Sequence, residues 1–139
     1  MGDGNLTWLI VEDDGAIQAV LEMMCDLWGN PHITLKDGRQ AMEYLSQPEL
    51  AAPLPDIALI DIRIPGPWGH LVSARLRQHP QIKDIGVILM TAYELEDKDE
   101  AQYLAESGAD ALIHKPLPSM DELYALAHQV VEQRRGQSH

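Results

Sequence analysis

Short apolar runs recur along the chain and are separated by amphipathic stretches. The runs cover residues 6–11, 32–36, 56–61, 85–91 and 109–114, and their length and composition are typical of β-strands. The stretch after the first run places Ile17, Leu21, Met24 and Trp28 at helical spacing, and Gly29 is a natural stop for that helix. The pattern therefore predicts strands that alternate with helices.

The helices expected after the other runs cover residues 37–47, 69–79, 96–108 and 119–135. Asp37 is a candidate N-cap of the second helix, and Ser119 and Glu122 have capping-box spacing at the start of the last one. Residues 48–55 read as a proline-rich loop. Five such units with continuous apolar strands predict an α/β fold, a single doubly wound five-stranded parallel sheet with helices on both faces.

Length and charge limit the functions that fit. A chain of 139 residues fits one domain, which we place at residues 5–133, with a C-terminal tail at 134–139. The net charge of −12, from 22 acidic and 10 basic residues, argues against direct binding of nucleic acid. The single cysteine, Cys25, excludes an internal disulfide, and no apolar run approaches the roughly 20 residues that span a bilayer. We expect a cytoplasmic domain without membrane contact, as a monomer or weak dimer.

Polar side chains stand where four of the apolar runs end. Glu12 and Asp13 follow the first run, Asp61 ends the third, Thr91 ends the fourth and Lys115 follows the fifth. Because the carboxyl ends of parallel strands meet at one edge of a sheet, these side chains are expected on one rim. A carboxylate at the end of a buried strand is costly to desolvate unless it is paired or bound to a metal. We therefore interpret Asp61 as a functional residue.

The types of residue on this rim favour phosphoryl chemistry. A hard divalent cation would relieve the repulsion among the acidic side chains, and magnesium is typically held by one or two carboxylates together with a phosphate group. Lys115 supplies a positive charge and Thr91 a hydroxyl, which suit a phosphoryl group on a carboxylate oxygen. The sequence predicts Asp61 as a nucleophile and Mg²⁺ as the cofactor.

Four motifs, LIVEDD, ALIDIRIPGPWG, VILMTAY and GADALIHKPL, carry a resemblance that extends from about Leu6 to about Val131. In their order and spacing the chain resembles the receiver domain of bacterial two-component response regulators, which implies a flavodoxin-like fold. The resemblance implies that Asp61 is the phosphoryl acceptor and that Glu12 and Asp13 are the acidic pair that serves magnesium.

The same resemblance extends to three further positions. It implies that the backbone carbonyl of Arg63 completes the protein ligands of the metal, and that Thr91 and Lys115 contact the phosphoryl oxygens. It also implies a cis peptide bond between Lys115 and Pro116. Leu112 departs from the pattern, because the family often has Tyr or Phe three residues before the lysine, so the usual aromatic switch is absent.

The resemblance implies phosphorelay signalling. A histidine kinase or phosphotransfer protein would donate to Asp61, and the change would switch a surface that binds an unknown downstream protein. No separate turnover substrate is expected, so the chain is not predicted to be an enzyme beyond its own phosphorylation and dephosphorylation. No effector domain fits after Val131, which leaves a stand-alone protein or a domain of a larger regulator. The alternative is a degenerate receiver that acts as a constitutive interaction module.

Two other classes fit the residues less well, and two neighbours of the site have open roles. An aspartyl-phosphate phosphatase would need an aspartate where Arg63 stands, and a flavodoxin-like nucleotide binder would need a phosphate cradle where the acidic EDDG stands.

Arg63 and Tyr93 flank the expected approach of water to Asp61. Trp68 adds an indole to the adjacent loop, either as a partner contact or as a packed lid.

Overall fold

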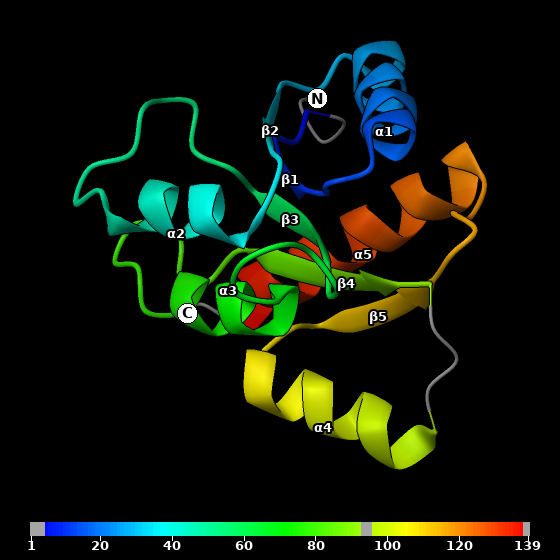
Figure 1. Ribbon diagram of the computed structural model, residues 1–139. Coiled ribbons are helices and arrows are strands. Elements are labelled where there is room, and N and C mark those ends of the chain that lie inside the picture. Colours follow the sequence, from blue (N-terminus) through cyan, green and yellow to red (C-terminus); the bar gives the residue numbers. More distant parts are fainter. Residues whose placement is uncertain (1–4, 93–95, 138–139) are drawn as a thin grey trace.

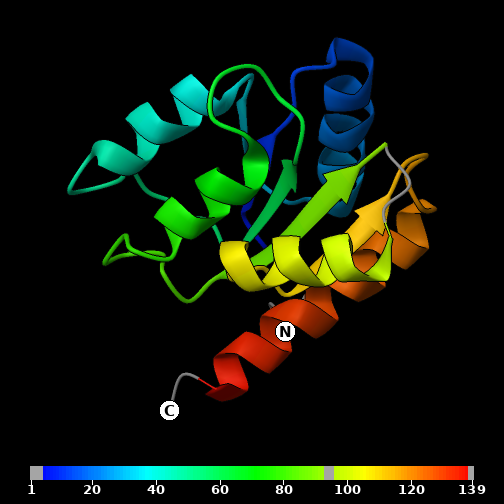
Figure 2. The same cartoon turned by 60° about the horizontal axis from the view of Figure 1, so that its bottom comes forward.

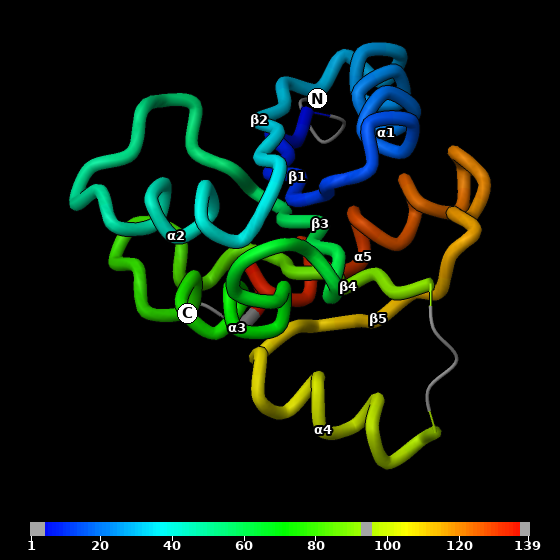
Figure 3. Tube along the Cα trace, in the orientation of Figure 1, coloured from blue at the N-terminus to red at the C-terminus, as the bar shows by residue number. Residues whose placement is uncertain are grey.

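The computed structural model describes residues 5–92 and 96–137, and within them five parallel strands form one sheet (Figure 1). The strands are β1 (Trp8–Val11), β2 (His32–Leu35), β3 (Ile57–Asp61), β4 (Gly86–Thr91) and β5 (Ala111–His114). They lie in the order β2-β1-β3-β4-β5, and each neighbouring pair is parallel. The predicted doubly wound parallel sheet is confirmed, and the tube trace of Figure 3 follows its crossovers.

Helices cover both faces of the sheet. They are α1 (Gly15–Trp28), α2 (Gly38–Ser46), α3 (Gly69–Leu76), α4 (Asp97–Ser107) and α5 (Met120–Gln137). Two of them, α1 and α5, pack on one face, and α2, α3 and α4 pack on the other. Helix α5 continues to Gln137, two residues beyond the predicted helix end at 135, so it extends into the segment 134–139 that the sequence assigned to a C-terminal tail. Among the described residues, no helix is both long enough and apolar enough to cross a membrane.

Polar and glycine residues cap the ends of three helices. Asp14 accepts hydrogen bonds from the first turn of α1, and Gly29 ends that helix with a φ of 75°, a left-handed conformation that suits glycine. Asp37 accepts from the backbone of α2 at 2.8 Å. Ser119 and Glu122 exchange hydrogen bonds of 3.1 and 3.2 Å, which is the reciprocal capping box expected from their spacing. The local sequence therefore sets where these helices begin and end.

Alternate residues of each strand feed two separate cores. On β1, Trp8 and Ile10 join the core under α1 and α5, whereas Leu9 and Val11 join the core under α2, α3 and α4. All four are buried, as are all the residues of β3 and β4. A strand covered on both faces has no polar side, which explains why these strands read as continuous apolar runs.

An aromatic ladder runs across the core under α1 and α5. Trp8 on β1 stacks with Trp28 on α1 at 5.4 Å between ring centroids, Trp28 lies 5.3 Å from Tyr124, and Tyr124 lies 4.2 Å from His128 on α5. Contacts of this kind add directional packing to the burial of apolar surface. The ladder connects both helices of this face to the sheet.

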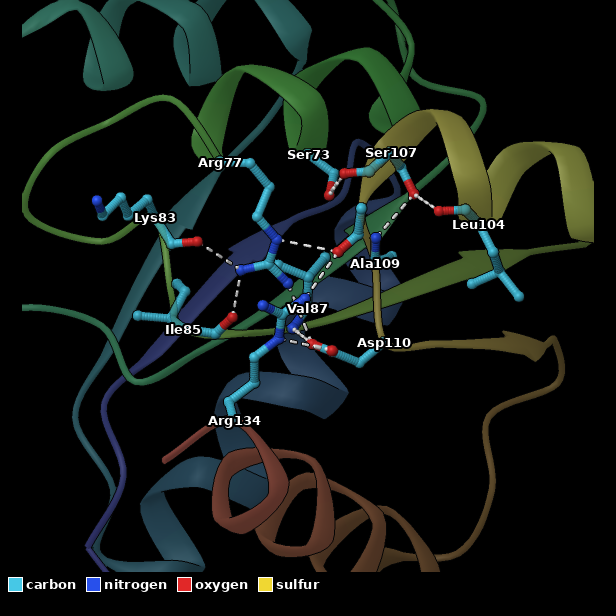
Figure 4. A network of polar contacts seen from close by, with 11 residues as sticks. Ser73, Arg77, Lys83, Ile85, Val87, Leu104, Ser107, Ala109, Asp110 and Arg134 are labelled. Atoms are coloured by element: carbon cyan, nitrogen blue, oxygen red, sulfur yellow. Dashed lines mark hydrogen bonds and ion pairs between the residues drawn. The ribbon is translucent and has the colours of Figure 1, made fainter. Parts of the chain in front are cut away.

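A polar network joins α3, α4 and α5 at the edge of the sheet where β4 begins (Figure 4). Arg77, just after α3, donates to the carbonyl oxygens of Lys83 and Gly108 at 2.9 Å each and to that of Ile85. Its guanidinium also lies 3.1 Å from Asp110, which forms a second ion pair of 2.7 Å with Arg134 on α5. The network holds the last turn of α5 against the loop between α4 and β5.

The order of strands changes direction between β1 and β3. The chain runs from β1 outward to β2 on one side, then returns to β3 on the other side of β1. At such a switch point the loops leave the carboxyl ends of neighbouring strands in opposite directions and open a crevice. The residues that follow Val11 and Ile60, which are register partners, therefore face each other at this rim.

Candidate functional site

Three carboxylates meet at the switch point. Glu12 and Asp13 directly follow β1, and Asp61 is the last residue of β3. One carboxylate oxygen from each lies within 4.8 Å of those of the other two. Glu12 is completely buried and Asp61 is 6% exposed, whereas Asp13 is exposed at the mouth of the site. The structure thus brings together the three acidic side chains that the sequence assigned to a metal.

Lys115 bridges the two buried carboxylates. Its ammonium nitrogen lies 2.7 Å from Oε1 of Glu12 and 3.1 Å from Oδ2 of Asp61, to which it donates a hydrogen bond. The backbone amide of Lys115 donates to the carbonyl of Thr91 at 2.8 Å, which fixes the lysine beside the end of β4. The bond between Lys115 and Pro116 is cis, as the resemblance implied.

Burial and charge alter the protonation of this cluster. Burial raises the pKa of Glu12 to about 7, and the charge of Asp61 acts in the same direction, against the hydrogen bonds from Lys115 and the amide of Asp14. Burial alone would lower the pKa of Lys115, but its hydrogen bonds to Glu12 and Asp61 and their charges outweigh burial and raise it. Lys115 is therefore a cation at neutral pH, and it pairs with both Glu12 and Asp61.

Thr91 and Arg63 lie on the same rim with less defined roles. Thr91 ends β4 and is 2% exposed. The preceding residue, Met90, accepts a hydrogen bond at its carbonyl from the backbone amide of Ile62 at 2.8 Å, which joins the end of β4 to the loop after Asp61. Arg63 is exposed, and its guanidinium carbon lies 4.8 Å from the centre of the Trp68 ring. The role of its carbonyl as a metal ligand stays a prediction. Tyr93 lies outside the described residues.

Two glycines let the loop after Asp61 pack close to the site. A Cβ atom on Gly69 would lie 2.0 Å from the carbonyl oxygen of Asp61, and one on Gly38 would lie 1.9 Å from that of Pro67. The amide of Gly69 donates to the carbonyl of Ile62 at 2.7 Å. Any larger residue at either glycine would push the loop away. In the sequence, the only sign of this role is that both glycines stand at the start of a predicted helix.

A further positioning contact comes from α1. The side-chain amide of Gln18 donates to the backbone carbonyl of Glu12 and so holds the turn between β1 and α1. Leu112, at the position of the missing aromatic switch, is half-buried and packs against the core under α2, α3 and α4. The side chain of Leu112 is thus a packing residue in this state.

The arrangement combines a cation site with an anion site. Oxygen atoms of Glu12, Asp13 and Asp61 form the ligand type that Mg²⁺ prefers. Lys115 presents a positive charge 3.1 Å from Oδ2 of the same Asp61 carboxylate, within reach of a phosphoryl group attached to Asp61. Both Glu12 and Asp61 belong to the acidic cluster and pair with Lys115, and Asp61 is the one of the two that retains slight solvent exposure, at 6%.

Comparison with known proteins gives matches over nearly the whole chain. The model of the response regulator receiver domain family matches residues 8–128. The DNA-binding transcriptional regulator NtrC of Escherichia coli K12 is 32% identical over 134 residues, which cover 96% of this chain and 26% of that protein. Response regulator Rcp1 of Synechocystis is 32% identical over 99 residues, 68% of this chain and 67% of that protein. The chain spans about a quarter of the length of NtrC.

Solved structures show the same architecture. A putative response regulator from Chloroflexus aurantiacus superposes with a TM-score of 0.76 at 26% identity and covers 92% of this chain and 98% of its own. A receiver domain of a sensor histidine kinase from Pseudomonas aeruginosa PAO1, solved with a magnesium ion coordinated in its active site cleft, gives a TM-score of 0.74 at 23% identity. It covers 92% of this chain and 98% of its own.

Proposed function

The chain belongs to the response regulator receiver domain family of two-component signalling, and on this premise we propose that Asp61 accepts a phosphoryl group from a partner protein. Phosphorylation would then change a surface that a downstream protein reads. The observation that carries the proposal is the position of Asp61, whose carboxylate is shared between the charge of Lys115 at 3.1 Å and the acidic cluster with Glu12 and Asp13.

The residues at the rim fit a magnesium ion. Glu12, Asp13 and Asp61 offer oxygen ligands within reach of one another, and burial together with the charge of Asp61 raises the pKa of Glu12, so a cation would favour its ionised form. The magnesium bound by the Pseudomonas receiver domain supports the same assignment. When bound, Mg²⁺ would neutralise charge on the acidic groups and on the incoming phosphoryl oxygens.

The transfer step follows from the placement of Asp61 and Lys115. A carboxylate oxygen of Asp61 attacks the phosphorus of a phosphohistidine, so that an O–P bond forms while the P–N bond breaks and the electron pair stays on the imidazole. The hydrogen bond of 3.1 Å from Lys115 holds the Asp61 carboxylate in one orientation. The lysine then pairs with a phosphoryl oxygen, and the Thr91 hydroxyl is assigned to a second one.

The surface of α1 supports a protein as the donor. Val20, Met23 and Leu27 form one apolar stripe at helical spacing, and they are 39%, 53% and 66% exposed. The helix begins at Gly15, directly after the acidic residues of the site. A contiguous exposed apolar stripe is typical of an interaction surface. We assign it to the phosphodonor, because a protein that packs there lies beside Asp61.

The first test is the intact mass after treatment with acetyl phosphate and magnesium. Wild-type protein should gain the mass of one phosphoryl group, and Asp61→Asn should gain none. Asp84→Asn, which makes the same change at an exposed position near the start of β4, is the matched control and should behave as wild type. A wild type that gains no mass would make the degenerate interaction module the better reading.

A second test separates the protein donor from the chemistry. Met23→Glu puts a charge into the exposed apolar stripe of α1 and leaves Asp61 untouched. Transfer from a cognate phosphorylated histidine kinase, sought in a panel of candidate kinases, should fall, whereas labelling by acetyl phosphate should not change. Equal transfer from the kinase to both proteins would remove α1 from the donor surface.

A further inference from the structure

The groove between α3 and α4 is a surface that phosphoryl transfer does not use. Figure 2 shows α4 lying alongside α3, and the groove at their boundary has a volume of about 720 Å³. We define it as the α3–α4 groove by five of its lining residues: Trp68, Leu71, Asp99, Tyr103 and Glu106. We propose that this groove binds a segment of the downstream protein in which arginine side chains are flanked by apolar ones.

The apolar part of the groove is exposed to solvent. Trp68 is 37% exposed and Leu71 is 48% exposed, so two large apolar side chains of the groove are accessible to solvent. Tyr103 lies beside them on α4, and its ring contacts the edge of His70 at 4.8 Å. Covering such a patch with apolar side chains of a partner removes it from water and favours binding.

The charge of the groove selects a cation. Helix α4 carries four acidic residues and one basic residue, Lys98, which gives a net charge of −3, and both Asp99 and Glu106 line the groove. His70 lies 3.9 Å from Glu106, but burial lowers its pKa, so that it adds no positive charge at neutral pH. A partner of opposite charge is therefore complementary to this face.

A guanidinium is the cation that best matches the indole. Arg63 of this chain already lies over the Trp68 ring, 4.8 Å from its centre, so the local geometry accommodates a planar cation against the indole. Arginine can also form two parallel hydrogen bonds with a carboxylate such as that of Asp99 or Glu106, which the ammonium of lysine cannot do. The groove thus favours arginine.

The walls of the groove are held together at one end. Ser73 on α3 donates to the carbonyl of Ser107 at 2.8 Å, as the close-up in Figure 4 shows. Arg77 donates to the carbonyl of Gly108 at 2.9 Å. Ser73 and Ser107 are both buried. These bonds keep the C-terminal end of α4 against α3, so the groove is formed before a partner arrives and little is lost on ordering it.

The groove is connected to the acceptor through Arg63. This residue is two positions after Asp61, and its guanidinium lies over Trp68, which lines the groove. A phosphoryl group on Asp61 would add negative charge and attract the guanidinium away from the indole. The freed ring could then receive the partner's arginine. This dependence on phosphorylation rests on the proposed function, whereas the binding itself does not.

Binding is tested on the unphosphorylated protein. The probe is the acetylated, amidated peptide LRLLRL, with LQLLQL as its neutral match, titrated into ¹⁵N-labelled protein at roughly physiological salt. Shifts should cluster at residues 66–71 and 99–106 for the first peptide and be absent for the second. Shifts spread over all acidic surfaces, or centred on α1, would overturn the proposal.

A pair of double variants tests whether the groove residues bind. Leu71→Ala with Glu106→Gln removes one exposed apolar side chain and one charge from the groove, and should weaken binding of LRLLRL about tenfold. Met23→Ala with Glu43→Gln makes the same two kinds of change on α1 and α2 and should leave the affinity within about twofold. Equal losses in both doubles would show that the peptide binds by net charge alone.

The connection to Asp61 is tested with acetyl phosphate. Protein whose mass shows one added phosphoryl group should bind LRLLRL about two- to fivefold more tightly, which is the size of an exposed cation–π contact. Arg63→Gln should reach a similar affinity without phosphorylation. An unchanged affinity in the phosphorylated protein would disprove the connection. If no mass is gained, the proposed function fails, and binding to the unmodified protein still decides whether the groove is a docking site.

Discussion

Glu12 should make the metal-free protein less stable as the pH rises. Its folded pKa is about 7, against an unfolded value of 4.5, because the side chain is completely buried and lies near Asp61. Between these values the folded state binds a proton more tightly than the unfolded state does, so the free energy of unfolding falls with increasing pH. The stability associated with the protonated Glu12 side chain is fully present below about pH 4.5 and is lost as the pH rises through about 7.

The magnitude follows from the shift. At about 1.4 kcal/mol per pH unit, a rise in pKa from 4.5 to about 7 costs about 3 kcal/mol once the buried carboxyl is fully ionised. Less than 1 kcal/mol of this cost, roughly, is already present at pH 5, and almost all of it is present at pH 8. Wild-type protein should therefore lose about 2 to 3 kcal/mol more stability between pH 5 and pH 8 than Glu12→Gln, whose amide does not titrate.

Urea unfolding with excess chelator, at pH 5 and at pH 8, measures this difference. Glu43→Gln makes the same chemical change at an exposed position of α2 and should leave the wild-type dependence unchanged. Magnesium should restore stability to the wild type more at pH 8 than at pH 5, because the metal binds the ionised carboxylate. If Glu12→Gln and wild type lose the same free energy of unfolding between the two pH values, ionisation of the Glu12 carboxyl does not destabilise the fold and the prediction is wrong.

Three further predictions concern packing and reactivity. Gly69→Ala should destabilise the fold and slow labelling of Asp61 by acetyl phosphate, because its Cβ would lie 2.0 Å from the Asp61 carbonyl; Gly15→Ala, with open space around it, should do neither. Leu112→Ala should cost about 2 kcal/mol in urea unfolding, at the low end for a half-buried leucine, yet keep the phosphoryl mass gain. Burial raises the pKa of the Cys25 thiol to about 12, so iodoacetamide at pH 8 should modify it only at the rate of unfolding; rapid alkylation of folded protein would contradict this.

The order of strands and helices could be predicted because each strand is covered on both faces. Such strands appear as apolar runs without polar interruptions, and the helices between them carry recognisable caps at Asp37 and at Ser119. The position of the candidate site could be predicted in the same way. Glu12, Asp61 and Lys115 stand at the ends of apolar runs, and the carboxyl ends of parallel strands meet at one edge of the sheet. The local pattern was sufficient wherever a feature depended on strand direction and side-chain alternation.

Other features depend on contacts between distant segments and could not be read locally. The predicted domain boundary at residue 133 left Arg134 in a C-terminal tail, but Arg134 pairs with Asp110 and stabilises the last turn of α5. Glu12 and Asp13 are neighbours with the same charge, yet one is completely buried and the other is exposed, because only one of them points toward Lys115. The close approach of Gly69 to Asp61 likewise arises only when β3 and α3 are in place.

The three tryptophans provide two intrinsic spectroscopic signals, circular dichroism and fluorescence, that report on different parts of the protein. Trp8 and Trp28 stack at 5.4 Å inside the core, an arrangement that couples their electronic transitions and produces a near-ultraviolet circular dichroism signal sensitive to tertiary packing. Trp68 is 37% exposed in the loop after Asp61, and the guanidinium of Arg63 lies over its ring. Its fluorescence therefore responds to solvent and to nearby charge. A change in fluorescence without a change in dichroism therefore reports on the loop around Trp68, whereas a change in both signals reports on unfolding of the core.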